Sequence, residues 1–253
     1  MIIVRNLTKH YGDRAAVDSI DLEVGPGEIF GFLGPNGAGK TTTIKMLAGQ
    51  LLPDRGTIRI QGHDMAAEPL LCKKITGYIP DRPFLYEKLT GQEFLQFVAS
   101  LYELDGEMFR RNSGYFLKLF DLAADRHHLI ESYSHGMRQK LMIAAAFMLE
   151  PPLIVVDEPM VGLDPKSGKI VKELFKNHSR KARSIFLSTH SLEIAEELCD
   201  RIAIIDKGRI RAVGTLAALR RKAELADSGL EDIFLELTNA AELRTIINVL
   251  RKG

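Results

Sequence analysis

Residues 34–41 read Gly34-Pro35-Asn36-Gly37-Ala38-Gly39-Lys40-Thr41, a glycine-rich loop that ends in a lysine and a hydroxyl. The loop follows the apolar run 29–33 and precedes a helix-compatible segment, so we predict that it joins a strand to a helix. Glycines let successive backbone N–H groups turn towards one anion, and the helix N-terminus adds partial positive charge. A tight turn with a chance lysine is the alternative, which the flanking strand and helix disfavour. The sequence therefore predicts a binding site for ATP.

The parts of this loop have different predicted roles. Lys40 reaches the terminal phosphates, where it also serves catalysis, and Thr41 offers its hydroxyl to Mg²⁺. The predicted ATP-binding residues of the loop are Gly34, Pro35, Asn36, Gly37, Ala38, Gly39, Lys40, Thr41 and Thr42.

A second segment places two acids at the end of an apolar strand, where the run 153–156 is followed by Asp157, Glu158 and Pro159. A buried strand normally keeps charge away unless the charge is paired or binds a metal. We predict that Asp157 holds Mg²⁺, directly or through water, and that the catalytic residue Glu158 polarises a water against the γ-phosphate. The alternative is an acidic turn after a core strand, and the glycine-rich loop makes it the weaker one.

The composition predicts a globular protein without a nucleic-acid surface. The 253 residues are 45% hydrophobic, and 34 Lys and Arg balance 33 Asp and Glu without a long basic block. Cys72 and Cys199 form no metal-binding pattern, and the first five residues do not begin a signal peptide, which fits a reducing cytoplasm. No apolar run approaches the roughly 20 residues that span a bilayer. We therefore expect membrane contact only through another chain.

The periodicity of apolar residues divides the chain into strands and helices. Residues 19–24 alternate strictly and end at Gly25, which predicts a half-buried strand, and residues 57–60 alternate again. Residues from about 88 to 150 are typical of a helical insertion, which opens with the capping box Thr90-Gly91-Gln92-Glu93. Its apolar residues at helical spacing are interpreted as core; they are Phe94, Phe97, Val98, Leu101, Phe109, Phe116, Leu119 and Phe120.

Strand-like runs return after the insertion at 153–156, 184–188 and 201–205, with helical segments between them. This alternation predicts a mainly parallel sheet with helices on its faces. Lys207-Gly208 is typical of a hairpin turn. Three short helices are expected to start near Thr215, Ser228 and Asn239, and Ser228-Gly229-Leu230-Glu231 is a second capping box.

Three further motifs occur in a recognisable order. They are Lys9-His10-Tyr11-Gly12, Gly162-Leu163-Asp164-Pro165 and Ser188-Thr189-His190. Together with the glycine-rich loop and the paired acids, they resemble the motifs of ABC-type ATPases, the nucleotide-binding subunits of ABC transporters, over essentially the whole chain. The resemblance implies that Tyr11 stacks on adenine, that Asp164 lies on a loop at the dimer interface, and that the catalytic residue His190 contacts the γ-phosphate. The residues alone would also allow a core tyrosine, an ordinary helix start and a structural histidine.

The resemblance also implies a fold and a domain organisation. The fold is α/β, a RecA-like P-loop NTPase with a parallel sheet core, an N-terminal antiparallel β part and an inserted α-helical subdomain. One nucleotide-binding domain would span residues 1–253, with its core at about 1–87 and 151–215, its helical subdomain at about 88–150 and a C-terminal helical tail at about 215–253.

Two motifs depart from the family pattern. The signature, usually Leu-Ser-Gly-Gly-Gln, is Tyr133-Ser134-His135-Gly136-Met137 here, and the resemblance places Ser134, His135 and Gly136 against the ATP of a partner chain. A serine that only caps a helix is the alternative. Asp81 stands where the family commonly has glutamine, so it could bind Mg²⁺ but cannot donate a hydrogen bond when ionised. An aspartate in a plain turn is the alternative there. Such departures resemble the exporter-like ABC-2 branch, whose membrane subunits are separate proteins.

The implied function is the hydrolysis of ATP, with Mg²⁺, to power a separate transmembrane subunit, and an exporter is expected. A second ATPase subunit, identical or not, would complete each site, because this chain carries one copy of each motif. The chain would then lie at the cytoplasmic face of the membrane without direct contact to nucleic acid. A soluble ABC ATPase that remodels a cytosolic assembly or nucleic-acid complex is the alternative. A kinase is disfavoured, because no arginine-rich lid is evident and Glu158 with His190 suits water as the nucleophile.

Overall fold

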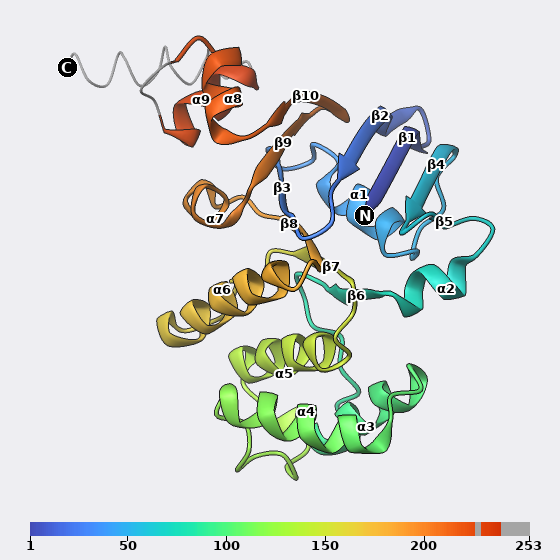
Figure 1. Ribbon diagram of the computed structural model, residues 1–253, viewed down its shortest axis with the longest axis vertical. Coiled ribbons are helices and arrows are strands. Elements are labelled where there is room, and N and C mark those ends of the chain that lie inside the picture. Colours follow the sequence, from blue (N-terminus) through green and yellow to red (C-terminus); the bar gives the residue numbers. More distant parts are fainter. Residues whose placement is uncertain (226–228, 239–253) are drawn as a thin grey trace.

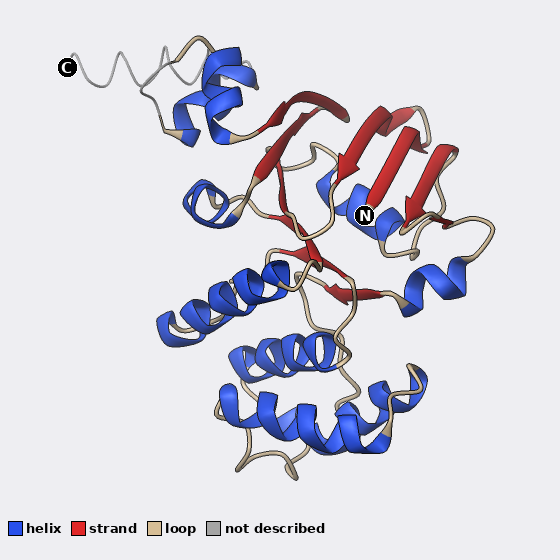
Figure 2. Cartoon of the chain, in the orientation of Figure 1, coloured by secondary structure: helices blue, strands red, loops and turns tan. Residues whose placement is uncertain are grey.

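The computed structural model describes residues 1–225 and 229–238. Two sheets lie on either side of one helix, and the other helices lie outside them (Figures 1 and 2). The strands are β1 (Ile2–Tyr11), β2 (Arg14–Val24), β3 (Ile29–Leu33), β4 (Arg55–Ile60), β5 (His63–Asp64), β6 (Thr76–Ile79), β7 (Leu153–Asp157), β8 (Ser184–Ser188), β9 (Arg201–Asp206) and β10 (Arg209–Gly214). The helices are α1 (Lys40–Leu47), α2 (Pro69–Lys74), α3 (Gly91–Leu101), α4 (Gly106–Leu119), η1 (Ile130–Ser132), α5 (His135–Met148), α6 (Pro165–Arg180), α7 (Leu192–Leu198), α8 (Leu216–Lys222) and α9 (Leu230–Leu237).

The first sheet is antiparallel, with strand order β2-β1-β4-β5. Its strand β2 shows the alternation that the sequence predicted, because Ile20, Leu22 and Val24 are buried while the residues between them are exposed. One face of this sheet packs on α1 and the other meets solvent, as antiparallel sheets can.

The second sheet has the order β10-β9-β3-β8-β7-β6, and only β10 runs antiparallel to its neighbour. Every residue of β3, β7 and β8 is buried, because helices cover both faces of these strands. The β9–β10 hairpin turns at Lys207 and Gly208, whose φ angles are 49° and 78°. The predicted parallel sheet and its hairpin turn are therefore confirmed, as is the α/β fold class.

The helix α1 lies between the two sheets, where Ile44, Met46 and Leu47 are fully buried against residues of both. On the opposite face of the parallel sheet, α6 and α7 pack against β3 and α6 also packs against β8 (Figure 1). The sheet is thus covered on both sides, which keeps its strands apolar and leaves chemistry to the loops at their ends.

The segment between β6 and β7 is helical, as expected, and lies below the sheets in Figure 1. The predicted capping box is present: Thr90 accepts from the Glu93 backbone N–H, and the Glu93 carboxylate accepts from the Thr90 N–H. The prediction that all its apolar residues are core is wrong for Phe97 and Leu101, which are 39% and 64% exposed. Phe97 packs edge-on against the exposed Tyr86, and Leu101 lines a groove at the surface. The aromatic core consists instead of Phe94, Phe109, Phe116 and Phe120.

The C-terminal part begins with α8, which Thr215 caps as predicted by accepting from the Ala218 N–H. Helix α9 starts at Leu230 with Gly229 as its N-cap. Ser228, with its expected capping box, and Asn239 lie outside the described residues. Within the part of the chain that the structure describes, none of the helices has the length and apolar character needed to cross a bilayer.

Candidate functional site

The candidate site forms where four neighbouring parallel strands end. In the order β3-β8-β7-β6, their carboxyl ends lead to the glycine-rich loop, His190, the pair Asp157 and Glu158, and Asp81. Parallel strands present their carboxyl ends at one edge, where α/β proteins bind ligands. A cavity of about 480 Å³ lies there, lined by Tyr11, Arg14, Ala16, Asn36, Gly37, Gly39, Lys40, Thr41, Thr42, Asp81, Asp157, Glu158 and His190. Most of the predicted site residues are therefore brought together.

The glycine-rich loop needs glycine at two positions for steric reasons. Gly39 has φ 111°, and a Cβ there would lie 2.4 Å from the carbonyl oxygen of Ala16. A Cβ on Gly34 would lie 2.3 Å from the carbonyl oxygen of Ile205. Gly34, Pro35 and Ala38 belong to the loop but do not line the cavity, so they shape its backbone. No side chain caps α1 at Gly39, so the first N–H groups of this helix are left to a bound anion.

Lys40 is a cation that lines the cavity, as is Arg14. Its Nζ donates to the carbonyl oxygens of Gly34, at 2.6 Å, and Pro35, at 3.2 Å. Burial lowers the pKa of Lys40, while the carboxylates of Glu158 and Asp157 act in the opposite direction. A bound polyphosphate would add negative charge and so favour the ammonium form.

Thr41 and Asp157 form the polar pair next to Lys40. The Thr41 hydroxyl donates to Oδ2 of Asp157 at 3.2 Å, although these residues are 116 positions apart. Asp157 is 3% exposed, and burial raises its pKa, as do the nearby charges of Asp81 and Glu158. Among the residues described here, no cluster of three or more His, Cys, Asp or Glu side chains could hold a metal on its own. Mg²⁺ is usually held by one or two carboxylates plus phosphate oxygens, so this pair fits it.

Glu158 is held by two groups at the mouth of the cavity. Its Oε1 lies 2.8 Å from Nδ1 of His190, and its Oε2 accepts from the Thr189 hydroxyl at 3.1 Å. Its backbone has φ 50°, where the chain turns out of β7, and its N–H donates to the carbonyl oxygen of Ser188 on β8. The side chain is 17% exposed. Both strands therefore fix a partly buried carboxylate that faces the cavity.

Two residues that line the cavity, Arg14 and Ala16, were not predicted from the sequence. Tyr11 lines the cavity and is 55% exposed, so the alternative of a core tyrosine is wrong. Arg14 pairs with Tyr11 across the β1–β2 hairpin and donates to the carbonyl oxygen of Gly37 at 3.3 Å. The sequence could have indicated Arg14, because it is a basic residue three positions after Tyr11, the predicted adenine-stacking residue.

Ser134, His135, Gly136 and Asp164 do not line this cavity. They lie together elsewhere, since a Cβ at Gly162 would lie 2.2 Å from the His135 ring and Lys140 is 3.0 Å from Asp164. Ser134 caps α5, accepting from the Met137 N–H at 3.2 Å, and Asp164 caps α6. Hydrogen bonds from Ser167 hold the pKa of Asp164 well below its usual range. Both residues thus have the capping roles that were the alternatives.

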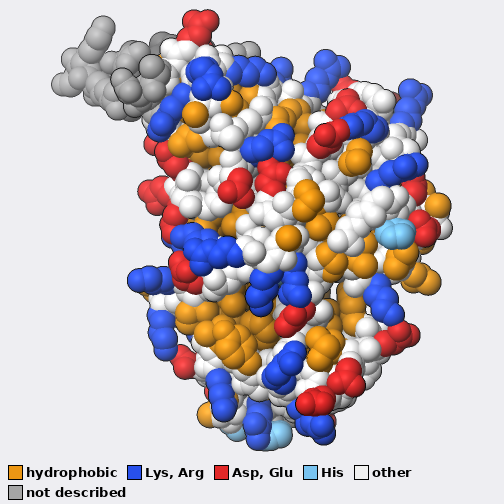
Figure 3. Space-filling model, viewed as in Figure 1, with side chains coloured by type: hydrophobic (Ala, Val, Ile, Leu, Met, Phe, Trp, Pro, Cys, Tyr) orange, Lys and Arg blue, Asp and Glu red, His pale blue; other side chains and the backbone are white. Residues whose placement is uncertain are grey.

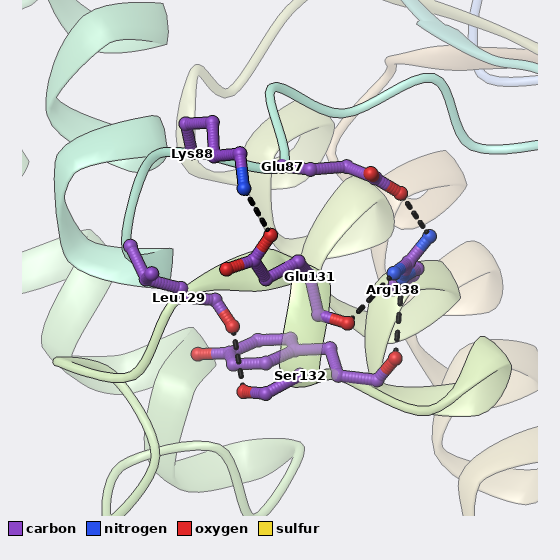
Figure 4. A network of polar contacts seen from close by, with 7 residues as sticks. Glu87, Lys88, Leu129, Glu131, Ser132 and Arg138 are labelled. Carbon is purple, nitrogen blue, oxygen red and sulfur yellow. Dashed lines mark hydrogen bonds and ion pairs between the residues drawn. The ribbon is translucent and has the colours of Figure 1, made fainter.

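A polar network joins the loop after Asp81 to the segment before α5 (Figure 4). Arg138 donates to the Glu87 carboxylate at 2.7 Å and to the carbonyl oxygens of Glu131, at 3.1 Å, and Tyr133, at 3.2 Å. Lys88 adds an ion pair with Glu131 at 2.5 Å. The residues come from two segments about 45 positions apart, and no role was assigned to them from the sequence. Arg138 therefore connects the loop at Glu87 with the segment 131–133 that precedes α5.

We expect Arg138→Ala to destabilise the protein by about 1–2 kcal/mol, because three hydrogen bonds of a half-buried cation are lost. We also expect ATPase activity to fall about tenfold or more, because displacements of about 1 Å at positioning residues are costly. Urea unfolding and phosphate release measure the two effects. Lys88→Ala is the control, because Lys88 is 83% exposed and should leave both almost unchanged. Equal behaviour of the two variants would contradict the role of Arg138.

The glycine-rich loop, the Thr41–Asp157 pair and the placement of Glu158 define a P-loop nucleoside triphosphatase. Comparison with known proteins narrows this class: the family model described as "ABC transporter" matches residues 17–161, more than half of the chain. The chain belongs to the ABC transporter family, as an ATP-binding subunit with ATPase activity.

Relatives and solved structures agree with this assignment. The chain is 36% identical over 238 residues to the ABC-type transporter ATP-binding protein EcsA of Bacillus subtilis, covering 94% of this chain and 96% of that protein. It is 40% identical to the daunorubicin/doxorubicin resistance ATP-binding protein DrrA of Streptomyces peucetius, covering 85% and 65%. A structure of an ABC transporter ATP-binding subunit matches with a TM-score of 0.91 at 38% identity, over 94% of this chain and 99% of that one. A dimeric bacterial ABC transporter cassette matches with a TM-score of 0.78 at 25% identity, over 85% and 99%.

Proposed function

We propose that this chain is one half of an ATPase dimer that hydrolyses ATP to drive a separate membrane-spanning subunit of an exporter. The observation that carries the proposal is one cavity that joins a phosphate-binding loop, Lys40, the Thr41–Asp157 pair and Glu158. A cation and free N–H groups bind phosphates, while a carboxylate at the mouth can act on water.

The hydrolytic roles follow from the positions of the side chains. Glu158 orients the attacking water and accepts its proton, and His190 beside it contacts the γ-phosphate. Lys40 offsets charge on the transferred phosphoryl group. Thr41 and Asp157, with Asp81 lining the same cavity, would hold Mg²⁺, which would supply further charge compensation. Tyr11, which is exposed at the rim, offers its ring to adenine.

A second ATPase subunit completes the site in this proposal. Ser134, His135 and Gly136 lie at the N-terminus of α5, outside the cavity of their own chain, so they are available to the ATP of a partner. The 14-residue helix directs its positive end to that point. Asp164 lies on the adjoining loop. The dimeric cassette among the solved relatives supports this arrangement.

This chain has a surface groove on which the membrane subunit could dock. A groove of about 480 Å³ lies between the helical insertion and the core, and its lining includes Tyr78, Phe84, Val98 and Leu101. Phe84 is 87% exposed, which is unusual for such a large apolar side chain. Asp81 in the nucleotide cavity is only three residues away from it. A partner segment in this groove would therefore sense the state of the nucleotide through the loop 80–86. Leu101, which was predicted to be a core residue but is exposed, would contact the membrane subunit in this proposal.

We expect Phe84→Asp to lower the amount of membrane subunit that co-purifies from a detergent extract at least about tenfold. The reason is that a charge buried in an apolar contact is costly. Leu70→Asp is the matched control, because Leu70 is 81% exposed but does not line the groove. Mass spectrometry identifies what co-purifies. A polytopic protein with the natural chain supports the proposal, whereas ribosomes, nucleic acid or a soluble assembly factor would replace it with the remodelling function.

The proposal also covers the direction of transport, the location of the chain and the limits of its subdomains. Relatives are named for drug resistance and for Nod factor export, which favours an exporter. The chain would lie peripherally on the cytoplasmic face of the membrane. We place the catalytic core at about 1–87 and 151–215, the helical subdomain at about 88–150 and the tail from about 215 onwards, which agrees with the helices α3 to α5 inside the insertion.

A further inference from the structure

A groove between α4 and α6 lies outside both surfaces described above. It consists of two adjoining hollows of about 410 and 330 Å³, which share Tyr115, Leu174 and Asn177. Figure 3 shows hydrophobic side chains gathered over this part of the molecule, with Lys and Arg side chains at their border. Each hollow has the size of a small-molecule site. We call the two hollows together the α4–α6 groove.

One end of the α4–α6 groove is rich in cations. Arg180, Lys181 and Arg183 line the larger hollow, and Glu150 is its one acidic residue. Glu150 pairs with Arg183 at 2.8 Å, and among the described residues Arg180 donates to the side-chain oxygen of Asn177, at 3.2 Å. Two cations therefore remain without a carboxylate within the hollow, which favours an anion there.

A buried histidine lines the same hollow. His178 is 5% exposed, and its Nε2 has no hydrogen-bond partner among the described residues. Its ring lies edge-on to Phe147, with 5.5 Å between centroids, so its orientation is fixed. Burial, followed by the charges of Arg183 and Lys181, lowers the pKa of His178 to about 4, so the imidazole is neutral near pH 7. Buried polar atoms normally have partners, and a small shift of the lining side chains on binding would let a ligand atom provide one for this nitrogen.

The other end of the α4–α6 groove is apolar. Leu119, Ile170 and Leu174 line it, and Tyr115, which is 56% exposed, stands between the two hollows. Lys166, Lys169 and Glu173 also line this end, and Lys166 is paired with Asp121 at 2.6 Å. Among the described residues, the net positive charge is therefore larger at the His178 end, with three cations and one carboxylate against two cations and one carboxylate at the other end, where Leu119 and Ile170 add hydrocarbon surface.

We propose that the α4–α6 groove binds a small amphiphilic anion, with its anionic head beside His178, Arg180 and Lys181 and its hydrocarbon chain along Leu174, Ile170 and Leu119. Because α4 belongs to the helical insertion and α6 to the core, the ligand would bridge the two. The site shares no residue with the nucleotide cavity, so it stands apart from the proposed ATPase function.

Decanoate, used below its micelle concentration, tests the proposal on the full chain. We expect saturable heat in isothermal titration and a selective change in the NMR signals of His178, one of seven histidines, which the His178→Gln variant identifies. We also expect the titration of His178 to move to higher pH, because a neighbouring anion favours the imidazolium form. Butyrate has the head without the chain, and decanol has the chain without the charge. Equal binding of either one would overturn the proposal.

Charge reversal at the head separates this site from general surface binding. We expect Arg180→Glu with Lys181→Glu to weaken decanoate binding at least tenfold. Arg110→Glu with Lys118→Glu is the matched control, because both residues are exposed on α4 and neither lines the groove. Circular dichroism confirms folding of each double variant. The same affinity in both double variants, or no decanoate binding to the natural chain, would disprove the site.

Discussion

Glu158→Gln is expected to bind ATP normally but to lower the turnover number by about 10² to 10⁴ fold, because glutamine cannot accept a proton from water. Glutamine has the same shape and meets the same backbone requirement at φ 50°, so the turn after β7 should persist. It can also still accept from the Thr189 hydroxyl, which holds Glu158 at 3.1 Å. Phosphate release under saturating ATP measures turnover, and a fluorescent ATP analogue measures affinity.

The control for this variant is Glu103→Gln. Glu103 also has a positive φ, of 54°, but it is exposed, it pairs with Lys74, and neither of these residues lines the cavity. Its substitution should change neither turnover nor affinity. Unchanged hydrolysis in Glu158→Gln would remove Glu158 from its role as the base. A loss of affinity equal to the loss of turnover would show that it binds nucleotide instead.

Lys40→Ala is expected to weaken ATP binding by about 10 to 100 fold, since hydrogen bonds to a charged group contribute about 1.5–3 kcal/mol. In the structure the ammonium group donates to two carbonyl oxygens of its own loop, at 2.6 and 3.2 Å. These hydrogen bonds hold it against the phosphate-binding loop. Alanine removes the charge, while the backbone N–H groups remain. Titration with a fluorescent ATP analogue measures the loss.

Lys45→Ala is the matched control, because Lys45 is exposed on the same helix and does not line the cavity. It tests whether a general loss of positive charge near α1 explains the effect. Higher salt should weaken binding to the natural chain more than binding to Lys40→Ala, since less charge remains to be screened. An affinity for Lys40→Ala within twofold of the natural chain would contradict the proposed grip on phosphate.

The helices and strands that were predicted correctly are those whose residue pattern is set by interactions within the element itself. Residues 19–24 alternate because one face of the strand is buried, and the run 153–156 is wholly apolar because both faces are. Thr90 and Thr215 marked helix starts correctly because a capping hydroxyl acts within its own turn. The error at Phe97 and Leu101 has a similar basis. Helical periodicity shows that residues share a face, but it cannot show whether another element covers that face.

Much of the candidate site was also present in the sequence. Gly34, Gly39, Lys40 and Thr41 all belong to one short loop that must wrap around a phosphate group. Their spacing is therefore fixed within that loop and can be recognised from the sequence. Arg14 was missed, because its place in the cavity depends on the β1–β2 hairpin and on its contact with Gly37. Arg138 was missed for the same reason, since its partners lie on two separate segments.

The sequence by itself determined the phosphate-binding loop, the acidic strand end and the class of fold, because these follow from steric demands and periodicity over a few neighbouring residues. Only the tertiary structure decided that β3, β8, β7 and β6 lie side by side, which brings Thr41 to 3.2 Å from Asp157 and Glu158 to 2.8 Å from His190. It also decided that Ser134 lies outside the nucleotide cavity of its own chain and that His178 lines a groove between α4 and α6. The physical reason is that strand order and helix packing are set by the burial of apolar surface across the whole chain, which no short stretch of residues encodes.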